Sequence, residues 1–319
     1  MTDAPATPKR QVRLVLVLSE NWTLVAPGDL RALVRMAQEA EAAGFDGVMI
    51  SEHVVLGAGA DAGGLMANPR EYALPGNQDP RTPWPHSLLL LSAIATVTSE
   101  LRLIASAIIP PLRHPLLHAQ ELATLDRLCE GRLVVQPTVS WHAAEYRALG
   151  VPFGERGRRL DEHLAAWREV WRSTPASFHG RHYSFDDVYL EPGPYRPEGP
   201  RMWFGGSSVH RRLVERLVGY GSGFNPLGPV SDSDLARLRE AFDAAGRDWA
   251  EVEMVGGVRG RFPAPDAVAD LAEALESIPR QLGQGFRTFC LKPSQFTDDI
   301  SQVGAVCREA VARTARLTA

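Results

Sequence analysis

The sequence predicts an α/β protein, a (β/α)8 TIM barrel that occupies residues 1–319 as a single domain. Three observations predict this fold class. Eight short apolar segments suit strands of a parallel sheet that are buried on both faces. Amphipathic helical segments alternate with these strands, and no low-complexity linker divides the chain. The length also exceeds the roughly 250 residues that such a barrel needs. An open, doubly wound sheet is the alternative architecture.

The clearest strand–helix–strand unit lies between residues 101 and 150. Its first strand, 101–109, is an almost unbroken apolar run that ends at two prolines. Pro115 begins the helix, because the N–H that proline lacks would be unpaired at that position. Gly131 ends the helix, and a second strand follows at 132–135. Functional sites of such units lie at the carboxyl ends of the strands.

The rest of the chain follows the same pattern. A helix that begins after Asp29 runs to Gly44, and another is expected over 87–98. A long helix over 153–171 carries many Arg and Glu residues, which suit a solvated face with i,i+4 pairs. The remaining strands are expected at residues 12–18, 45–51, 202–204, 223–226, 252–258 and 286–291.

Two long segments interrupt the alternation, one after the second strand (56–85) and one before the fifth strand (173–201). Loops of that length inside a compact domain are usually functional, and loops set specificity in barrels. We expect Tyr72, Trp84 and Tyr183 to line a substrate pocket, with plain packing as the other interpretation. The second insertion looks like a short hairpin, which would leave its two histidines, His179 and His182, on the surface.

Composition excludes several classes of protein. The net charge of −4 gives no basic face for nucleic acid. No apolar run approaches the roughly 18 residues of a membrane span. The three cysteines are scattered and odd in number, which favours a reducing compartment. Residues 1–10 are polar, so we expect a flexible N-terminus without a signal peptide, and a cytoplasmic protein.

His53 follows the second strand, at the end of the barrel where catalytic groups are placed. A histidine can transfer protons near neutral pH, although a structural histidine is an equal alternative. His114 and His118 lie four residues apart and could share a helix face as zinc ligands do. The glutamate of a His-Glu-x-x-His motif is missing and no third ligand is evident, so we expect no metal.

The turn Gly205-Gly206-Ser207-Ser208 lies between a strand and a helix. Glycines let the backbone approach an anion, and serine hydroxyls with free helix N–H groups can hold phosphate oxygens. A plain turn with a serine helix cap is the other interpretation. By contrast, the glycines of 57–63 have neither the spacing nor the following helix of a dinucleotide fingerprint.

Together, these motifs resemble the bacterial-luciferase-like monooxygenase superfamily, and most closely its probable F420-dependent actinobacterial oxidoreductases. The resemblance runs from about Val12 to Asn225 and fades after that. It is carried by residues 42–48 (AAGFDGV), 51–53 (SEH), 114–128 (HPLLHAQELATLDRL), 131–133 (GRL), 149–162 (LGVPFGERGRRLDE, apart from position 154) and 203–208 (WFGGSS).

The resemblance implies a (β/α)8 barrel, often a homodimer, that binds FMN or the deazaflavin F420 at its carboxyl face. It implies a non-proline cis peptide at Ser106-Ala107, behind the cofactor ring. His53 matches the family's histidine beside the reactive edge of the ring, and residues 205–208 match its phosphate cradle. Among the residues that follow, His210, Arg211 and Arg212 could hold the acidic tail of F420, with ordinary surface charge as the alternative.

One departure from the family concerns residues 136–141, which read Gln-Pro-Thr-Val-Ser-Trp where a Gly-x-Gly-x-Gly-Trp is usual. Only Trp141 is kept, so side chains replace bare backbone at the cofactor. Three hypotheses follow. The first is an oxidoreductase that moves a hydride between F420 and a small organic substrate. The second is an FMN-dependent monooxygenase that uses reduced flavin and O2. The third is a barrel without cofactor that binds a ligand without catalysis.

Overall fold

The computed structural model describes residues 12–318, and the N-terminal residues 1–10 therefore lie outside the described part. Eight parallel strands close into a barrel in the order β1-β10-β9-β8-β7-β4-β3-β2, as the sequence predicts. The barrel strands are β1 (Arg13–Val17), β2 (Gly47–Ile50), β3 (Arg102–Ile108), β4 (Leu133–Pro137), β7 (Arg201–Phe204), β8 (Gly223–Phe224), β9 (Glu253–Val258) and β10 (Thr288–Leu291).

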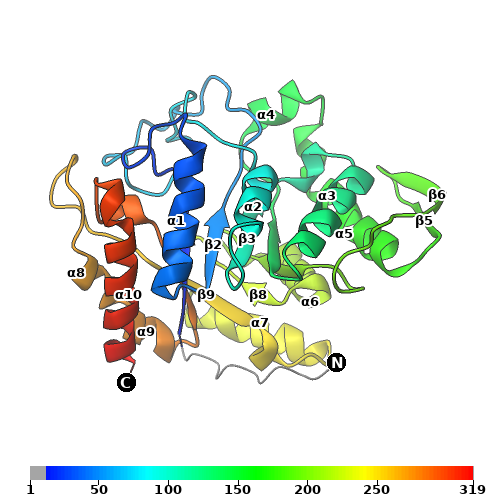
Figure 1. Cartoon of the computed structure of the whole chain (residues 1–319). Helices are drawn as coiled ribbons and strands as arrows, with labels where there is room; N and C mark the ends of the chain where they lie inside the picture. The colour runs from blue at the N-terminus through cyan, green and yellow to red at the C-terminus, as the bar shows by residue number, and fades with distance from the viewer. Residues whose placement is uncertain (1–11, 319) are drawn as a thin grey trace.

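The helices pack around the outside of this barrel (Figure 1). They are α1 (Leu30–Ala43), α2 (Ser87–Ala95), α3 (Pro115–Leu128), α4 (Ala143–Ala148), α5 (Arg156–Arg172), α6 (Arg211–Tyr220), α7 (Asp232–Ala244), α8 (Leu271–Leu275), α9 (Ile278–Gly283) and α10 (Val303–Leu317). Short 3-10 turns lie at Pro110–Leu112, Phe153–Glu155, Trp249–Glu251, Pro293–Gln295 and Ile300–Gln302. None of the helices in the described part is both long and apolar enough to cross a membrane.

Local sequence signals set several helix ends as predicted. The Asp29 carboxylate accepts a hydrogen bond from the Ala32 N–H at 3.0 Å and begins α1, which ends at Gly44 with φ 91°. Pro115 is the first residue of α3, and Gly131 follows that helix with φ 77°. The long helix predicted over 153–171 differs at its start, because a 3-10 turn precedes α5.

The second insertion forms the predicted hairpin, with strands β5 (Ala176–His179) and β6 (Ser184–Val188). It lies outside the barrel, against α5 (Figure 1). His179 is exposed, but the His182 side chain is only 5% exposed, within 4 Å of Glu155 and Glu162. The expectation that both histidines lie on the surface is therefore wrong for His182, because Glu162 of α5 and Glu155 of the preceding 3-10 turn cover it.

The interior of the barrel is a separate apolar cluster, enclosed by the strands. It is formed by Val15, Val17, Met49, Ile104, Val134, Trp203, Val255 and Cys290. A much larger cluster fills the space between the strands and the helices. Because side chains alternate along a strand, the residues two positions beyond the inner cluster must form the next layer toward the carboxyl ends.

Candidate functional site

That next layer is composed of small and polar residues, in contrast to the apolar cluster beneath it. Its members are Ser19, Ser51, Ser106, Gln136, Gly205, Gly257 and Lys292. We call this layer and the strand ends above it the barrel mouth. This change from apolar to small or polar residues, which occurs on seven of the eight strands, marks the end of the barrel that can hold a polar ligand.

A chain of hydrogen bonds links three strands across the mouth. The Gln136 side-chain oxygen accepts hydrogen bonds from Ser106 Oγ at 2.7 Å and from Asn225 Nδ2 at 2.8 Å. Gly205, at the end of the strand between those of Gln136 and Asn225, is required, because a Cβ there would overlap the Asn225 carbonyl oxygen. Gln136, a departure from the family pattern, is thus fixed as part of the mouth.

The Ser106-Ala107 peptide bond is cis, as the resemblance implies. The register of β3 against β4 shifts between Ser106 and Ile108, which makes a bulge at this point of the barrel.

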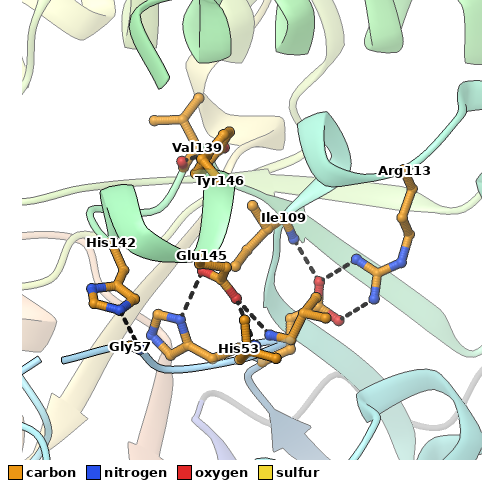
Figure 2. A network of polar contacts seen from close by, with 11 residues as sticks. His53, Gly57, Ile109, Arg113, Val139, His142, Glu145 and Tyr146 are labelled. Carbon is orange, nitrogen blue, oxygen red and sulfur yellow. Dashed lines mark hydrogen bonds and ion pairs between the residues drawn. The ribbon is translucent and has the colours of Figure 1, made fainter. Parts of the chain in front are cut away.

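His53 extends from the end of β2 into a buried network (Figure 2). Its Nδ1 atom lies 3.1 Å from Oε2 of Glu145, a fully buried carboxylate of α4. The other oxygen of Glu145 accepts the Val54 N–H at 2.5 Å. One carboxylate therefore fixes both the imidazole and the backbone that carries it, and Nε2 is the ring nitrogen left for a ligand.

The same loop is held by His142, at the start of α4. The Gly57 N–H donates to His142 Nε2 at 2.7 Å, which requires that nitrogen to be unprotonated. Burial lowers the pKa of His142, in agreement with this role. A Cβ at Gly57 would meet the Ala144 Cβ at 2.7 Å, so this glycine permits the close approach of loop and helix.

A second buried carboxylate, Glu52, ties the ends of β2 and β3 together. Its Oε1 accepts the Ile109 N–H at 2.8 Å and pairs with Arg113 Nη1 at 2.8 Å, and its Oε2 accepts from Arg113 Nη2 at 3.1 Å (Figure 2). This bidentate pair is a positioning element, because both oxygens of Glu52 are occupied by the protein.

Aromatic side chains surround His53. Trp84 and Trp141 lie edge-on to the imidazole, with ring centroids 5.0 and 5.9 Å away. Tyr72 packs on the inner apolar cluster of the barrel, and burial raises its pKa. Tyr183 is elsewhere: it contacts His163 and His114 under the β5–β6 hairpin, and the structure does not bring it to His53.

The insertion after β2 reaches across the mouth and is fastened on its far side. Asn68 Nδ2 donates to the carbonyl oxygens of Ala264 and Ala267, and Arg70 forms an ion pair with Asp298 at 2.7 Å. Tyr72 belongs to this insertion. Because its ring packs on the inner apolar cluster, the insertion covers the interior of the barrel. A different cavity, of about 1170 Å³, opens at the amino ends of the strands, away from His53.

The turn after β7 has the open backbone that an anion needs. A Cβ at Gly206 would meet nothing closer than 3.7 Å, and Ser207 and Ser208 are exposed. His210 caps α6 by accepting the Leu213 N–H. Arg211 is 81% exposed and pairs with Glu215 of its own helix, whereas Arg212 pairs with Asp161 of α5.

The mouth also carries donors that fit a cofactor with polar ring edges and a phosphate. Ser140 Oγ is buried without a hydrogen-bond partner among the described residues. The Gly206 backbone is open to a phosphate, as noted above. The residues present therefore fit a flavin or deazaflavin, whose phosphate Gly205–Ser208 would hold.

His114 and His118 do not form a ligand pair. His114 caps α3, whereas His118 is fully buried against His163 and Trp167. Across residues 12–318, no group of three or more His, Cys, Asp or Glu side chains is arranged to hold a metal ion.

Sequence reasoning missed Glu145, Arg113 and His142. Glu145 stands 92 residues from His53, so only the closed barrel reveals the pair. One signal was available: an acidic residue in the first turn of a short helix that directly follows the carboxyl end of β4.

The chain is similar in sequence to a known family of proteins. The family model described as luciferase-like monooxygenase matches residues 13–269. The FMNH(2)-dependent dimethylsulfone monooxygenase of Pseudomonas putida is 34% identical over 258 residues, which are 79% of this chain and 64% of that protein. The chain thus spans less than two thirds of that relative.

Two solved structures share the fold. Monooxygenase RslO1 from Streptomyces bottropensis superposes with a TM-score of 0.74 and 19% identity, over 96% of this chain and 100% of that one. An F420-dependent secondary alcohol dehydrogenase, solved with an F420–acetone adduct, has a TM-score of 0.73 and 16% identity, over 95% and 99%.

Proposed function

This chain is an enzyme of the luciferase-like monooxygenase family, and we propose that it transfers a hydride between the deazaflavin F420 and a small organic substrate. Membership of this family removes the hypothesis of a non-catalytic barrel. The family includes both F420-dependent and FMNH2-dependent enzymes, so the choice of cofactor is part of the proposal.

The observation that carries the proposal is the buried His53–Glu145 pair at the mouth. A carboxylate on Nδ1 holds the imidazole in one orientation and fixes which ring nitrogen is left for a ligand. His53 Nε2 is then available to take or give a proton beside a bound ring. Bound F420 supplies two-electron hydride chemistry at a carbon atom and reacts poorly with oxygen, which leaves orientation and proton transfer to the protein.

The other residues of the site would bind the cofactor and enclose His53. The Gly206 backbone and the hydroxyls of Ser207 and Ser208 hold the phosphate, and Trp84 and Trp141 shield His53 from water. The Ser106–Ala107 bulge lies behind the ring. Arg211 is the exposed cation nearest in sequence to the phosphate turn and would meet the carboxylates of the F420 tail.

An FMN-dependent monooxygenase is the second candidate, and the 34% identity to a dimethylsulfone monooxygenase favours it. The two cofactors differ in their tails, because F420 carries several carboxylates beyond the phosphate where FMN ends. A site for F420 should therefore need a cation outside the phosphate turn.

The test is to titrate the purified protein with F420 and with FMN by fluorescence quenching, at low and at high salt. We expect tighter binding of F420, and Arg211→Ala should narrow the gap between the two cofactors. The effect of Arg211 should fade as salt rises, because exposed charges are screened within about 8–10 Å. Equal or tighter binding of FMN, with turnover that needs O2, would promote the monooxygenase assignment.

A further inference from the structure

Lys292 is a fully buried cation at the mouth, with 0% of its surface exposed. It follows β10, two residues after Cys290 of the inner apolar cluster, and so it lies on the same face of the strand. Of the 34 cationic side chains in the sequence, only Lys9 and Lys292 are lysines. A chain that otherwise uses arginine thus has a lysine at a fully buried position.

The described part of the protein supplies a hydrogen-bond acceptor for only one N–H donor of this ammonium group. Lys292 Nζ donates to the Glu71 carbonyl oxygen at 2.8 Å and lies 5.5 Å from the centroid of the Tyr72 ring. An ammonium group has three N–H donors, and Glu71 is its one hydrogen-bond partner among residues 12–318. The described residues therefore supply no hydrogen-bond acceptor for its other two donors.

Glu20 is the acidic neighbour of Lys292. It follows β1, the strand that lies between β2 with His53 and β10 with Lys292. Glu20 has φ 59°, and the next residue, Asn21, accepts the Ser294 N–H at 3.1 Å. This contact ties the segment that carries Glu20 to the segment that carries Lys292.

Glu20 also lies on the His53 side of the mouth. It lines a small cavity of about 10 Å³ together with Trp84, which contacts His53. Of the surrounding titratable and charged groups, His53 faces Glu20, Glu71 faces Lys292, and Tyr72 lies beside both. Arg259 and Cys290 face Tyr72.

Burial shifts the pKa values of Lys292 and Glu20 toward each other. Burial lowers the pKa of Lys292, although the charges of Glu20 and Glu71 oppose that shift. Burial raises the pKa of Glu20, although Lys292 and His53 oppose it. Two titratable groups whose environments displace their pKa values in opposite directions are typical of acid–base sites. Arginine could not serve here, because a guanidinium does not lose its proton in proteins.

We propose that Lys292, with Glu20 as its proton partner, donates the proton that accompanies hydride transfer to a polar double bond of the substrate, a C=O or C=N group. This inference rests on the proposed function. It assigns to the substrate a carbonyl or imine that lies between the cofactor ring and Lys292.

The reaction balances when Lys292 and His53 both exchange protons with solvent. The substrate would gain one hydride and one proton, which a reduced deazaflavin supplies as one hydride and one released proton. The substrate carbon receives the hydride with its two electrons, and the π electrons of the C=O bond move to oxygen. There an O–H bond forms as one Lys292 N–H bond breaks. The Glu20 carboxyl group then gives its proton to the amine and is reprotonated from solvent, while His53 would accept the proton released at the ring and return it to solvent.

The first arm of the test needs no cofactor. Protein labelled with [13C]lysine gives two Cε resonances, one for Lys292 and one for Lys9, which serves as the internal control. We expect Lys292 to titrate at a lower pH than Lys9, because burial disfavours the charged amine. Glu20→Gln should lower the Lys292 midpoint further, because it removes an anion that favours the charged amine. A Lys292 midpoint equal to that of Lys9 and unmoved by Glu20→Gln would overturn the inference.

The second arm compares two variants, Lys292→Arg, which keeps the charge but cannot titrate, and Lys292→Met, which keeps the length. Both should lower kcat about tenfold or more at unchanged cofactor Kd, and both should remove the same limb of the pH profile. If Lys292→Arg keeps wild-type kcat and pH profile, Lys292 is only a structural charge. A preference for FMN would defeat the proposed function but leave the lysine titration intact, so the two failures are distinguishable.

Discussion

His53 Nδ1 and Glu145 Oε2 lie 3.1 Å apart in a region from which water is excluded, and the same carboxylate holds the Val54 backbone. The imidazole can therefore change neither its position nor its tautomer without loss of a hydrogen bond to Glu145. This rigidity distinguishes His53 from a histidine that is merely packed, such as His118.

His53→Gln should separate binding from turnover. Glutamine is uncharged and cannot shuttle a proton, but its size is close to that of the imidazole. We expect cofactor affinity to stay within a few-fold of wild type while turnover drops by about 10²-fold or more. Unchanged turnover with a physiological substrate would remove His53 from the mechanism.

Glu145→Gln should affect both activity and stability. The amide keeps the shape of the carboxylate but loses its charge, and it leaves the imidazole or the Val54 N–H poorly paired. We expect turnover to fall about 10- to 100-fold, and the free energy of unfolding to drop by about 1–3 kcal/mol. Glu240→Gln, on an exposed face of α7, is the matched control and should change neither quantity. Unchanged turnover in Glu145→Gln would show that the carboxylate does not position His53.

Neighbouring glycines in the phosphate turn give a paired test. Gly206→Val should fold, since the space around its Cβ is open, but the side chain should block the phosphate and weaken cofactor binding. Ser207→Ala should cost about 1.5–3 kcal/mol of binding, the worth of one hydrogen bond to a charged group. Gly205→Ala should instead destabilise the fold, because its Cβ would overlap the Asn225 carbonyl. If Gly206→Val binds cofactor normally, the phosphate is held elsewhere.

Stability should decline in mild acid because of His118 and His163. Burial lowers the pKa of both well below 6.5, and none of their ring nitrogens has a hydrogen-bond partner among the described residues. In the unfolded chain these two histidines bind protons near pH 6.5, whereas in the folded protein they stay neutral at that pH. The stability that these two neutral rings contribute is therefore complete above pH 6.5 and is lost as pH falls below it.

The expected loss is about 1.4 kcal/mol for each histidine at one pH unit below 6.5. Urea unfolding between pH 8 and pH 5.5 measures it, and His163→Phe should halve the slope. His179→Gln, at an exposed site, should leave the slope unchanged. A free energy of unfolding that is flat across this range would contradict the argument.

Much of the fold could be predicted because its signals are local. Asp29, Gly44 and Pro115 mark helix ends through the backbone geometry of a few adjacent residues. The strands are recognisable because a strand buried on both faces is apolar at nearly every position. The hairpin of the second insertion was also predicted, but the burial of His182 was not, since it depends on carboxylates at and within the start of α5, Glu155 and Glu162.

The residues of the candidate site also fall into those that could be predicted from local signals and those that could not. His53 was predicted from its place at a strand end, Trp141 from the family resemblance and Trp84 from its place in the insertion after the second strand. The structure brings these three together. Glu145, Lys292 and Glu20 were not predicted, because their partners come from distant strands that only closure of the barrel makes adjacent. Tyr183 shows the converse: an aromatic residue in a long loop has no local signal for the surface on which it packs.

The Lys292–Glu71 contact has a consequence for measuring how the mouth opens. An amine-acylating reagent cannot reach Nζ while the insertion after β2 covers it, since Lys292 has no exposed surface. Each acylation of Lys292 therefore requires that segment to lift, as amide exchange requires local unfolding. The labelling rate, followed by mass spectrometry, reports the opening rate of the insertion, and Arg70→Ala should increase it by removing the Asp298 latch.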